Sequence, residues 1–235
     1  MAKDIERMKE IKIKAIIFDV GGVLQLPKNF VRLIQDPHLA GVPMHCGHRN
    51  KNVHEYLSNK LKIFLDQWFY AIDAVYSKSI EGKLSQGQVL EVISKNLGVN
   101  KIRLKHLLIH AYKKNFSLNK ELLEKIKKLK KKGYRVSILS DQWHFSKLAL
   151  VPKKLSKYFF PVIVSFNVGF RKPHPKIYKL MLKKLKLRPG QCLFIDNQEW
   201  NLRPAKKLKM HTILFKNNKQ LFKEKQWREL FKQFI

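Results

Sequence analysis

The chain has 235 residues, of which 45% are hydrophobic, and its formal net charge is +32. No window approaches the ~18 consecutive apolar residues that a membrane-spanning helix needs, and the N-terminus is too charged for a signal peptide, which predicts a cytoplasmic protein without a membrane partner. The two cysteines, Cys46 and Cys192, form no CxxC pair, so neither a disulfide framework nor a thiolate zinc site is expected.

The positive charge runs along the whole chain, from Lys3 to Lys232, without a dense basic tail. A field of this sign attracts polyanions such as nucleic acid, acidic membranes or phosphorylated substrates. The excess consists of 40 lysines against 9 arginines, whereas specific recognition of bases and phosphates favours arginine. A polyanion-binding protein, including one associated with nucleic acid, therefore stays an alternative rather than the favoured interpretation.

The first predicted element is a buried strand within residues 15–27, AIIFDVGGVLQLP. Its continuous apolar run is typical of a parallel strand that is covered on both faces. Asp19 follows the run and would lie outside the carboxyl end of the strand, where ligands bind in open α/β sheets. The alternative is that Asp19 only caps the turn made with the glycines after it.

The next stretch is mostly helical and is predicted to form a module inserted after the first strand. Residues 52–80 carry apolar side chains at helical spacing. Ser85 and Gln88 form a capping box for a second helical segment, which Gly98 ends. We therefore expect a core domain of residues 1–26 and 116–235 and a helical cap domain of residues 27–115.

Four potential metal ligands gather near the start of this module: His45, Cys46, His48 and His54. Their composition raises the hypothesis of a zinc site. Their spacing matches no common structural zinc pattern, however, and a loop that faces solvent or substrate is the alternative.

From residue 119 onward, predicted helices and strands alternate. Helices are expected at 120–133, 175–187, 201–209 and 227–235, and strands at 134–140, 161–166, 191–196 and 211–215. Strands joined by helices of this length imply a parallel sheet with right-handed crossovers. The predicted fold class is α/β: a doubly wound, Rossmann-like parallel sheet with an inserted, mostly α-helical cap.

Three of the predicted strands end in a polar residue: Asp19, Ser140 and Asp196. Because a parallel sheet has all its carboxyl ends at one edge, these groups can converge in one crevice. Lys172, in the loop GFRKPHP, is the cation expected to join them. Two carboxylates, a hydroxyl and an ammonium suit a magnesium ion and a phosphoryl group, although turns alone also place polar residues at strand ends.

The segments FDVGGVL, ILSD, GFRKPHPKIY and FIDNQEWNLRPAKKLKM resemble, in this order, the four motifs of the haloacid dehalogenase-like superfamily. The resemblance spans residues 14–215 and points to the branch whose helical cap follows the first motif. It implies a magnesium-dependent phosphatase for a small phosphorylated metabolite. In such an enzyme Asp19 attacks phosphorus and forms an aspartyl-phosphate, which water then cleaves.

The resemblance also implies a role for each matching residue. A carboxylate that attacks a phosphate dianion meets like-charge repulsion, so positive groups are needed beside it. Adjacent glycines let the backbone approach the phosphate and offer amide hydrogens to it. The implied sets are catalytic Asp19, Ser140 and Lys172; phosphate-binding Gly21, Gly22, Ser140, Asp141 and Lys172; and, for Mg²⁺, Asp19, the carbonyl of Gly21, Asp196 and Asn197.

Two departures from the family pattern bear on activity. Most phosphatases of the family carry a second aspartate two residues after the nucleophile, as general acid and base, but this chain has Gly21. The fourth motif usually holds two adjacent acids, but here the second is Asn197, a ligand with less charge. With these changes the chain could be a slow enzyme. The alternative is a catalytically degenerate protein that binds phosphate or a polyanion.

Other residues could supply the missing proton or choose the substrate. Asp141 and His144 follow the second motif and are the candidates for a replacement acid, the alternative for Asp141 being a cap on the following turn. A dehalogenase is less favoured, because the aromatic residue expected two positions after the nucleophile is absent. His48 and Arg49 in the cap would contribute to specificity if the cap closes over the site. The oligomeric state is not predicted.

Overall fold

The computed structural model describes residues 13–28 and 51–232. The strands are β1 (Ala15–Phe18), β2 (Gln25–Pro27), β3 (Phe116–Leu118), β4 (Arg135–Ser140), β5 (Val162–Val164), β6 (Cys192–Asp196) and β7 (His211–Leu214). The helices before β4 are α2 (Lys51–Leu61), α3 (Leu65–Ile80), α4 (Gln86–Leu97), α5 (Lys101–Asn115) and α6 (Lys120–Lys131). Those after β4 are α7 (His144–Leu150), α8 (Lys153–Ser156), α9 (Ser165–Val168), α10 (Pro175–Leu185), η3 (Pro189–Gln191), α11 (Glu199–Lys207), α12 (Asn218–Lys223) and α13 (Lys225–Lys232).

Five strands form a parallel sheet in the order β5-β4-β1-β6-β7. β1 is the central strand, and its four residues are completely buried. Its register pairs Phe18 with Ile138 of β4 and with Ile195 of β6. β6 therefore ends one residue, and β4 two residues, past the level of Phe18, and all three carboxyl ends lie at one edge of the sheet. The predicted doubly wound α/β fold is confirmed.

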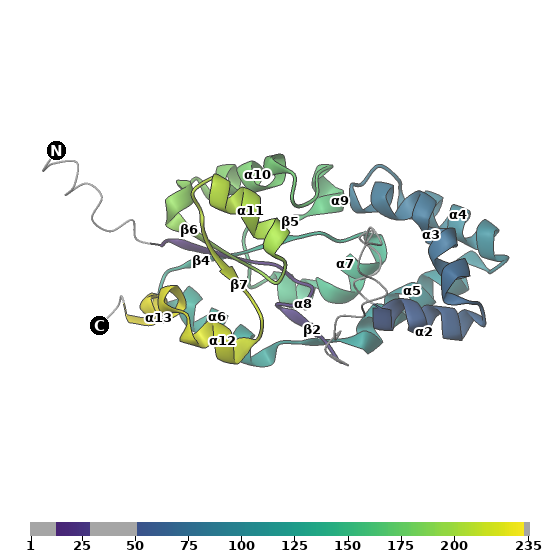
Figure 1. Cartoon of the computed structure of the whole chain (residues 1–235), viewed down its shortest axis with the longest axis horizontal. Helices are drawn as coiled ribbons and strands as arrows, with labels where there is room; N and C mark the ends of the chain where they lie inside the picture. Colours follow the sequence, from purple (N-terminus) through teal and green to yellow (C-terminus); the bar gives the residue numbers. More distant parts are fainter. Residues whose placement is uncertain (1–12, 29–50, 233–235) are drawn as a thin grey trace, which may run out of the picture.

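The two faces of the sheet are covered by different helices (Figure 1). Alternate residues of β1 point to opposite faces, as in any strand. Ile16 and Phe18 belong to the core beneath α6, α12 and α13, whereas Ala15 and Ile17 pack with α10 and α11. This coverage on both sides explains why the strand is apolar throughout rather than alternating.

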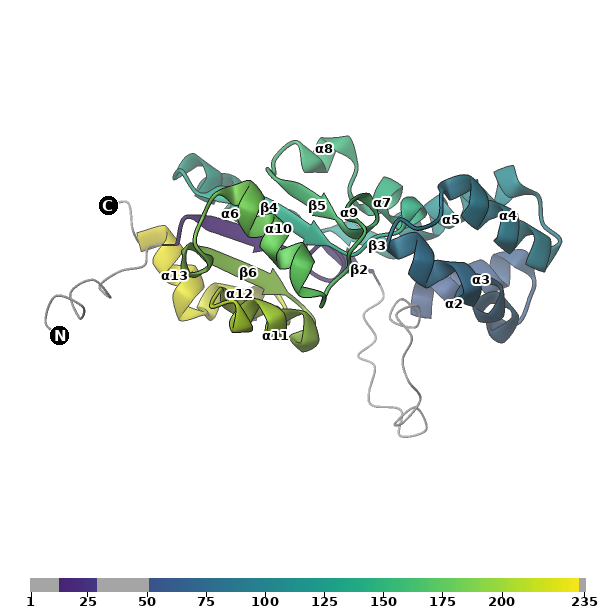
Figure 2. The ribbon, with the colours of Figure 1, turned by 90° about the horizontal axis from the view of Figure 1, so that it is seen from above.

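Helices α2 to α5 lie together beyond the end of the sheet, joined to it through the antiparallel pair β2 and β3 (Figures 1 and 2). The predicted capping box of α4 is present, and Gly98 ends the helix with a φ of 63°. The apolar stretch 52–80 is divided into α2 and α3, because the chain turns at Lys62, whose φ is 57°. The domain boundaries at 26/27 and 115/116 stay a prediction.

The hydrophobic core is continuous from the sheet into the helical cap. One buried cluster contains Phe18 and Ile138 of the sheet together with Trp68 of α3 and Tyr112 of α5. Trp143, just after β4, donates its indole N–H to the Tyr112 hydroxyl at 3.0 Å. Within residues 13–28 and 51–232, no helix has the length and apolar character needed to cross a membrane.

Candidate active site

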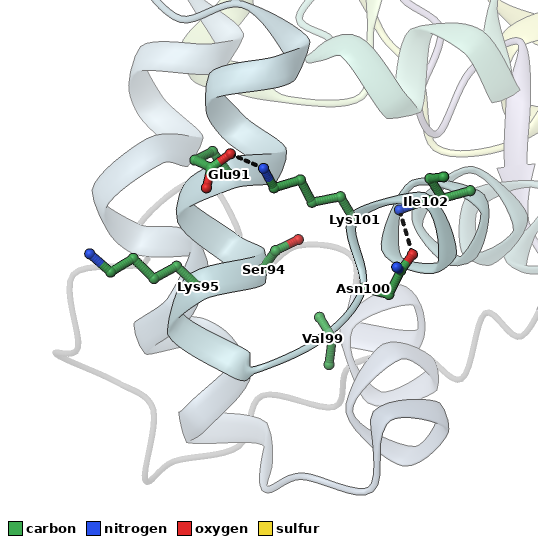
Figure 3. A pocket seen from close by; sticks show the side chains of 7 residues that line it. All are labelled: Glu91, Ser94, Lys95, Val99, Asn100, Lys101 and Ile102. Carbon is green, nitrogen blue, oxygen red and sulfur yellow. Dashed lines mark hydrogen bonds and ion pairs between the residues drawn. The ribbon is translucent and has the colours of Figure 1, made fainter.

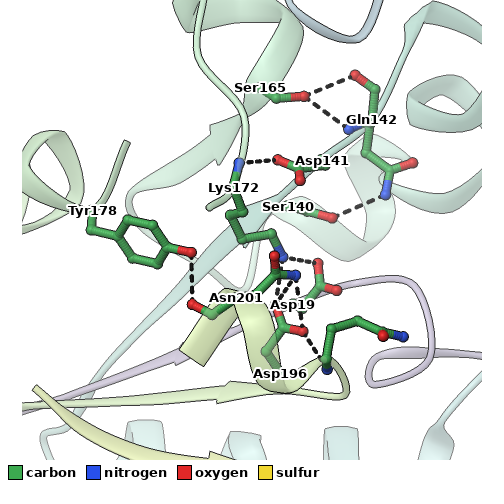
Figure 4. A network of polar contacts seen from close by, with 10 residues as sticks. Asp19, Ser140, Asp141, Gln142, Ser165, Lys172, Tyr178, Asp196 and Asn201 are labelled. Carbon is green, nitrogen blue, oxygen red and sulfur yellow. Dashed lines mark hydrogen bonds and ion pairs between the residues drawn. The ribbon is translucent and has the colours of Figure 1, made fainter. Parts of the chain in front are cut away.

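Asp19, Ser140 and Asp196 follow or end the adjacent strands β1, β4 and β6, so they meet at one edge of the sheet (Figure 4). Lys172 reaches this edge from the loop before α10. Its Nζ lies 3.0 Å from Oδ1 of Asp19 and 2.6 Å from Oδ2 of Asp196. The structure thus brings together the four residues that the sequence pattern selected, and their catalytic roles stay a prediction.

These charged groups are withdrawn from solvent. Lys172 is 4% exposed, Asp19 7% and Asp196 0%. Burial alone would lower the pKa of Lys172, but the carboxylates around it outweigh burial and raise that pKa. Burial raises the pKa of Asp196, while the Lys172 ammonium opposes this shift. A fixed, buried ammonium beside two carboxylates can bind phosphoryl oxygens strongly, since water screens it little.

Asp196 is held by several donors besides Lys172. Its Oδ1 accepts the backbone N–H of Gln198 at 2.8 Å, and both of its oxygens accept from Nδ2 of Asn201, at 3.2 and 3.1 Å. The hydroxyl of Tyr178 donates to the Asn201 carbonyl at 2.7 Å. Asp196 therefore orients Lys172, and its predicted bond to a metal is not tested.

Ser140 is held in place by a second set of polar contacts. Its Oγ accepts a hydrogen bond from Nε2 of Gln142 at 2.9 Å. Gln142 is fixed in turn by Ser165, whose hydroxyl accepts the Gln142 N–H at 3.1 Å and donates to the Gln142 carbonyl at 3.2 Å. All three residues are buried. The hydroxyl thus keeps one orientation at the edge of the sheet, as a binding group for a phosphoryl oxygen requires.

The two glycines after Asp19 stand in different surroundings. Gly22 has a φ of 84°, and a Cβ there would lie 2.3 Å from Nδ2 of Asn197, so this position requires glycine. A Cβ on Gly21 would meet nothing within 4 Å, and its φ is not positive. Asn197 packs directly on the turn, and its Oδ1 is buried without a hydrogen-bond partner in the described part of the chain.

Asp141 and His144, the two candidates for the missing acid, are held differently. Oδ1 of Asp141 accepts the backbone N–H of Lys172 at 3.0 Å, so the carboxyl faces the Lys172 loop rather than capping the turn after it. Burial raises the pKa of Asp141 to about 6. His144 instead contacts the cap: its Nε2 lies 2.9 Å from the carbonyl oxygen of Leu84, and its ring packs 4.7 Å from that of Phe166.

The connection between α3 and α4 docks on the loops that carry these residues. Glu81 forms an ion pair with Arg171 at 3.3 Å. Gly82 lies so close to the Phe166 carbonyl that a Cβ there would be 2.0 Å from its oxygen. The cap thus contacts the core directly beside the site.

Nothing in the described residues indicates a zinc site. Residues 13–28 and 51–232 contain no group of three or more His, Cys, Asp or Glu side chains that could hold a metal ion. His45, Cys46, His48 and Arg49 lie outside the described residues. His54 is buried in the cap, where its Nδ1 accepts the indole N–H of Trp68 at 2.7 Å.

A pocket of about 580 Å³ lies between α4 and α5 (Figure 3). It contains none of the residues predicted for the site. Its lining includes the exposed ion pair of Glu91 and Lys101. This pocket is therefore separate from the polar network at the edge of the sheet.

Sequence reasoning missed Asn201 and Tyr178. Asn201 lies five residues after Asp196, in the first turns of α11, and its side chain reaches back to the carboxylate at the end of β6. An amide within the fourth motif is a usable signal for such a contact. The Tyr178 contact joins α10 to α11 and has no local signal, because its partner is a backbone carbonyl.

Comparison with known proteins identifies relatives of the chain and supports its fold. The mouse bifunctional epoxide hydrolase 2 is 28% identical over 222 residues, which are 90% of this chain but 38% of the mouse protein, so the chain spans well under half of that relative. The glyceraldehyde 3-phosphate phosphatase of Methanothermobacter thermautotrophicus is 24% identical over 196 residues, 79% of this chain and 77% of that enzyme.

Solved structures show the same fold. A HAD family enzyme from Bacteroides thetaiotaomicron, in complex with magnesium and inorganic phosphate, superposes with a TM-score of 0.66 at 18% identity, over 90% of this chain and 100% of that one. The family model for haloacid dehalogenase-like hydrolases matches residues 13–209. The predicted resemblance is confirmed: the chain belongs to the haloacid dehalogenase-like hydrolase family.

Proposed function

We propose that the chain is a magnesium-dependent phosphatase that acts on a small phosphorylated metabolite through an aspartyl-phosphate on Asp19. The observation that carries the proposal is the buried ammonium of Lys172, held between Asp19 and Asp196 at the same sheet edge as the Ser140 hydroxyl. Phosphatases among the relatives and the phosphate complex of a structural neighbour support it.

The donor set at this edge fits Mg²⁺, which prefers oxygen ligands. Oδ1 of Asn197 is buried without a partner among the described residues. Within those same residues, Lys172 contacts Oδ1 of Asp19, and no contact is made with Oδ2. Asp19, Asn197 and the carbonyl of Gly21 would hold the ion, with Asp196 acting through Lys172. Bound there, Mg²⁺ supplies positive charge that offsets the repulsion between carboxylate and phosphate.

The chemistry of the chain's own residues takes two steps. Ser140 and Lys172 hold the phosphoryl oxygens while a carboxylate oxygen of Asp19 attacks phosphorus; an O–P bond forms to Asp19 and the bond to the leaving oxygen breaks. Water then attacks the aspartyl-phosphate, which releases inorganic phosphate and restores the Asp19 carboxylate. Both steps require a proton to move, to the leaving oxygen first and away from water afterwards.

The test is release of inorganic phosphate from a panel of phosphomonoesters, with Mg²⁺ or with EDTA. Asp19→Asn is expected to abolish release and to keep the fold, because an amide cannot attack phosphorus. Asp73→Asn, an exposed position on α3, is the matched control and should behave as the native chain.

Three outcomes would contradict the proposal. Undiminished release by Asp19→Asn would remove the mechanism. A native chain that binds phosphate but releases none from any ester would favour the degenerate alternative. Tight binding of a DNA duplex at about 0.15 M salt, regardless of its sequence, would favour the polyanion-binding form of that alternative.

A further inference from the structure

The proposed reaction needs a proton donor that position 21 does not provide. When the phosphorus–oxygen bond of an alkyl ester breaks, the leaving oxygen takes a proton or departs as a costly alkoxide. Gly21 has no side chain, so a titratable group on another element must serve. The described candidates at this edge are Asp141, His144, Lys172, Tyr178 and Asp196.

Four of these groups are committed to other contacts. Both oxygens of Asp196 accept hydrogen bonds inside the protein. Lys172 is ion-paired with two carboxylates, and these raise its pKa, so it stays charged. The hydroxyl of Tyr178 donates to the carbonyl of Asn201. The imidazole of His144 contacts the Leu84 carbonyl of the cap loop.

Asp141 remains, and the residues that would bind phosphate hold it on two sides. It directly follows Ser140 in the chain, and its Oδ1 accepts the backbone N–H of Lys172 at 3.0 Å (Figure 4). Oδ2 has no hydrogen-bond partner in the part of the chain that the structure describes. The carboxyl is therefore fixed at the edge of the phosphoryl-binding group with one oxygen left to carry a proton.

The charges around Asp141 suit this role. Burial raises its pKa to about 6, the Lys172 ammonium opposes the rise, and the carboxylates of Asp19 and Asp196 add to it. A general acid works best when its pKa lies near the working pH, since it then holds a proton and also gives it up readily.

We infer, on the basis of the proposed function, that Asp141 is the general acid and base of this enzyme. Its proton passes to the leaving oxygen while the bond between that oxygen and phosphorus breaks. In the same step the Asp19 carboxylate forms its bond to phosphorus. The Asp141 carboxylate then takes a proton from the water that attacks the aspartyl-phosphate, so the proton balance closes over one turnover. The acid comes from the end of β4 instead of the end of β1.

The experiment compares an alkyl ester, ethyl phosphate, with an aryl ester, 4-nitrophenyl phosphate, whose leaving oxygen needs no proton. Asp141→Asn keeps an oxygen that accepts the Lys172 N–H and an amide that hydrogen-bonds phosphate, but it cannot transfer a proton. We expect kcat/KM for the alkyl ester to fall by roughly 10² to 10⁴, and for the aryl ester by less than about 10. We expect alkyl-ester turnover by the native chain to decline above pH about 6, and this decline should be absent from the variant.

His144→Gln is the matched control, because its amide can still donate to the Leu84 carbonyl. It should leave the ratio of the two esters unchanged. An equal loss on both esters in Asp141→Asn, with the native pH profile, would assign Asp141 a purely structural role and overturn the inference, as would no loss at all. Asp19→Asn on the aryl ester separates the hypotheses: if it is inactive while Asp141→Asn matches the native chain, only the inference on Asp141 fails.

Discussion

Replacing Lys172 by methionine tests how strongly the site depends on one buried ammonium. Methionine retains most of the side chain's length beside the Phe194 ring, whose centroid lies 5.6 Å from Nζ. It leaves Asp19 and Asp196, at 7% and 0% exposure, without the cation between them. Removing one partner of a buried ion pair costs about 3–5 kcal/mol, because the remaining charge is unpaired. We expect Lys172→Met to lose this much free energy of unfolding at pH 7.5.

The loss should depend on pH with a definite sign. Burial already raises the pKa of Asp196, and Lys172 opposes the rise, so without the ammonium the folded-state pKa moves further above the unfolded value of about 3.9. A carboxyl whose pKa is higher in the folded state binds more protons there than in the unfolded state. The free energy of unfolding therefore falls as the pH rises from the unfolded-state pKa to the folded-state pKa. The deficit of Lys172→Met should therefore shrink as the pH is lowered toward 5.

Urea unfolding in EDTA at pH 5 and pH 7.5 measures both effects. Lys206→Met, which breaks the exposed pair with Glu199 at 3.0 Å, is the control and should change stability by less than about 1 kcal/mol. The reasoning is refuted if Lys172→Met costs no more than this control at pH 7.5, or if its cost is the same at both pH values.

Two further predictions concern the departures from the family pattern. Gly21→Asp should fold, since a Cβ there meets nothing within 4 Å, and because Asp141 already supplies the proton it should change kcat/KM for ethyl phosphate by less than about 10; a rise of about 10² in the folded variant would show that the native site lacks a positioned acid and would contradict the role of Asp141. Asn197→Asp should tighten Mg²⁺ binding in a calorimetric titration, because an anionic oxygen replaces the buried Oδ1; equal affinities would show that position 197 does not reach the ion.

The sheet and the convergence of the site could be predicted because each depends on local sequence. A continuous apolar run that ends in a polar residue identifies both a buried parallel strand and its functional end. Asp19, Ser140 and Asp196 meet because β1, β4 and β6 are neighbouring parallel strands whose carboxyl ends lie at one edge of the sheet. Lys172 could be added on charge alone, since a cation is the remaining requirement for binding a phosphoryl group.

The remaining features depend on contacts that have no local pattern. Asn201 reaches Asp196 through the position of α11 after β6, which no local sequence pattern specifies. The break between α2 and α3 falls at Lys62, a residue with no special preference for a positive φ. The choice between Asp141 and His144 required knowing that the cap loop occupies the histidine, which is a contact across 60 residues of sequence.

The two glycines after the nucleophile show why a departure from a family pattern needs a structure to interpret it. Gly22 is required by its backbone and by Asn197 beside it, whereas Gly21 stands in open space with an ordinary backbone. No steric constraint therefore explains the missing acid at position 21. Asp141 adds a carboxyl to the same electrostatic environment, since Lys172, Asp19 and Asp196 all act on its pKa. The sequence difference is then a relocation of the acid from one strand end to its neighbour, and the leaving-group dependence of Asp141→Asn distinguishes this relocation from a loss.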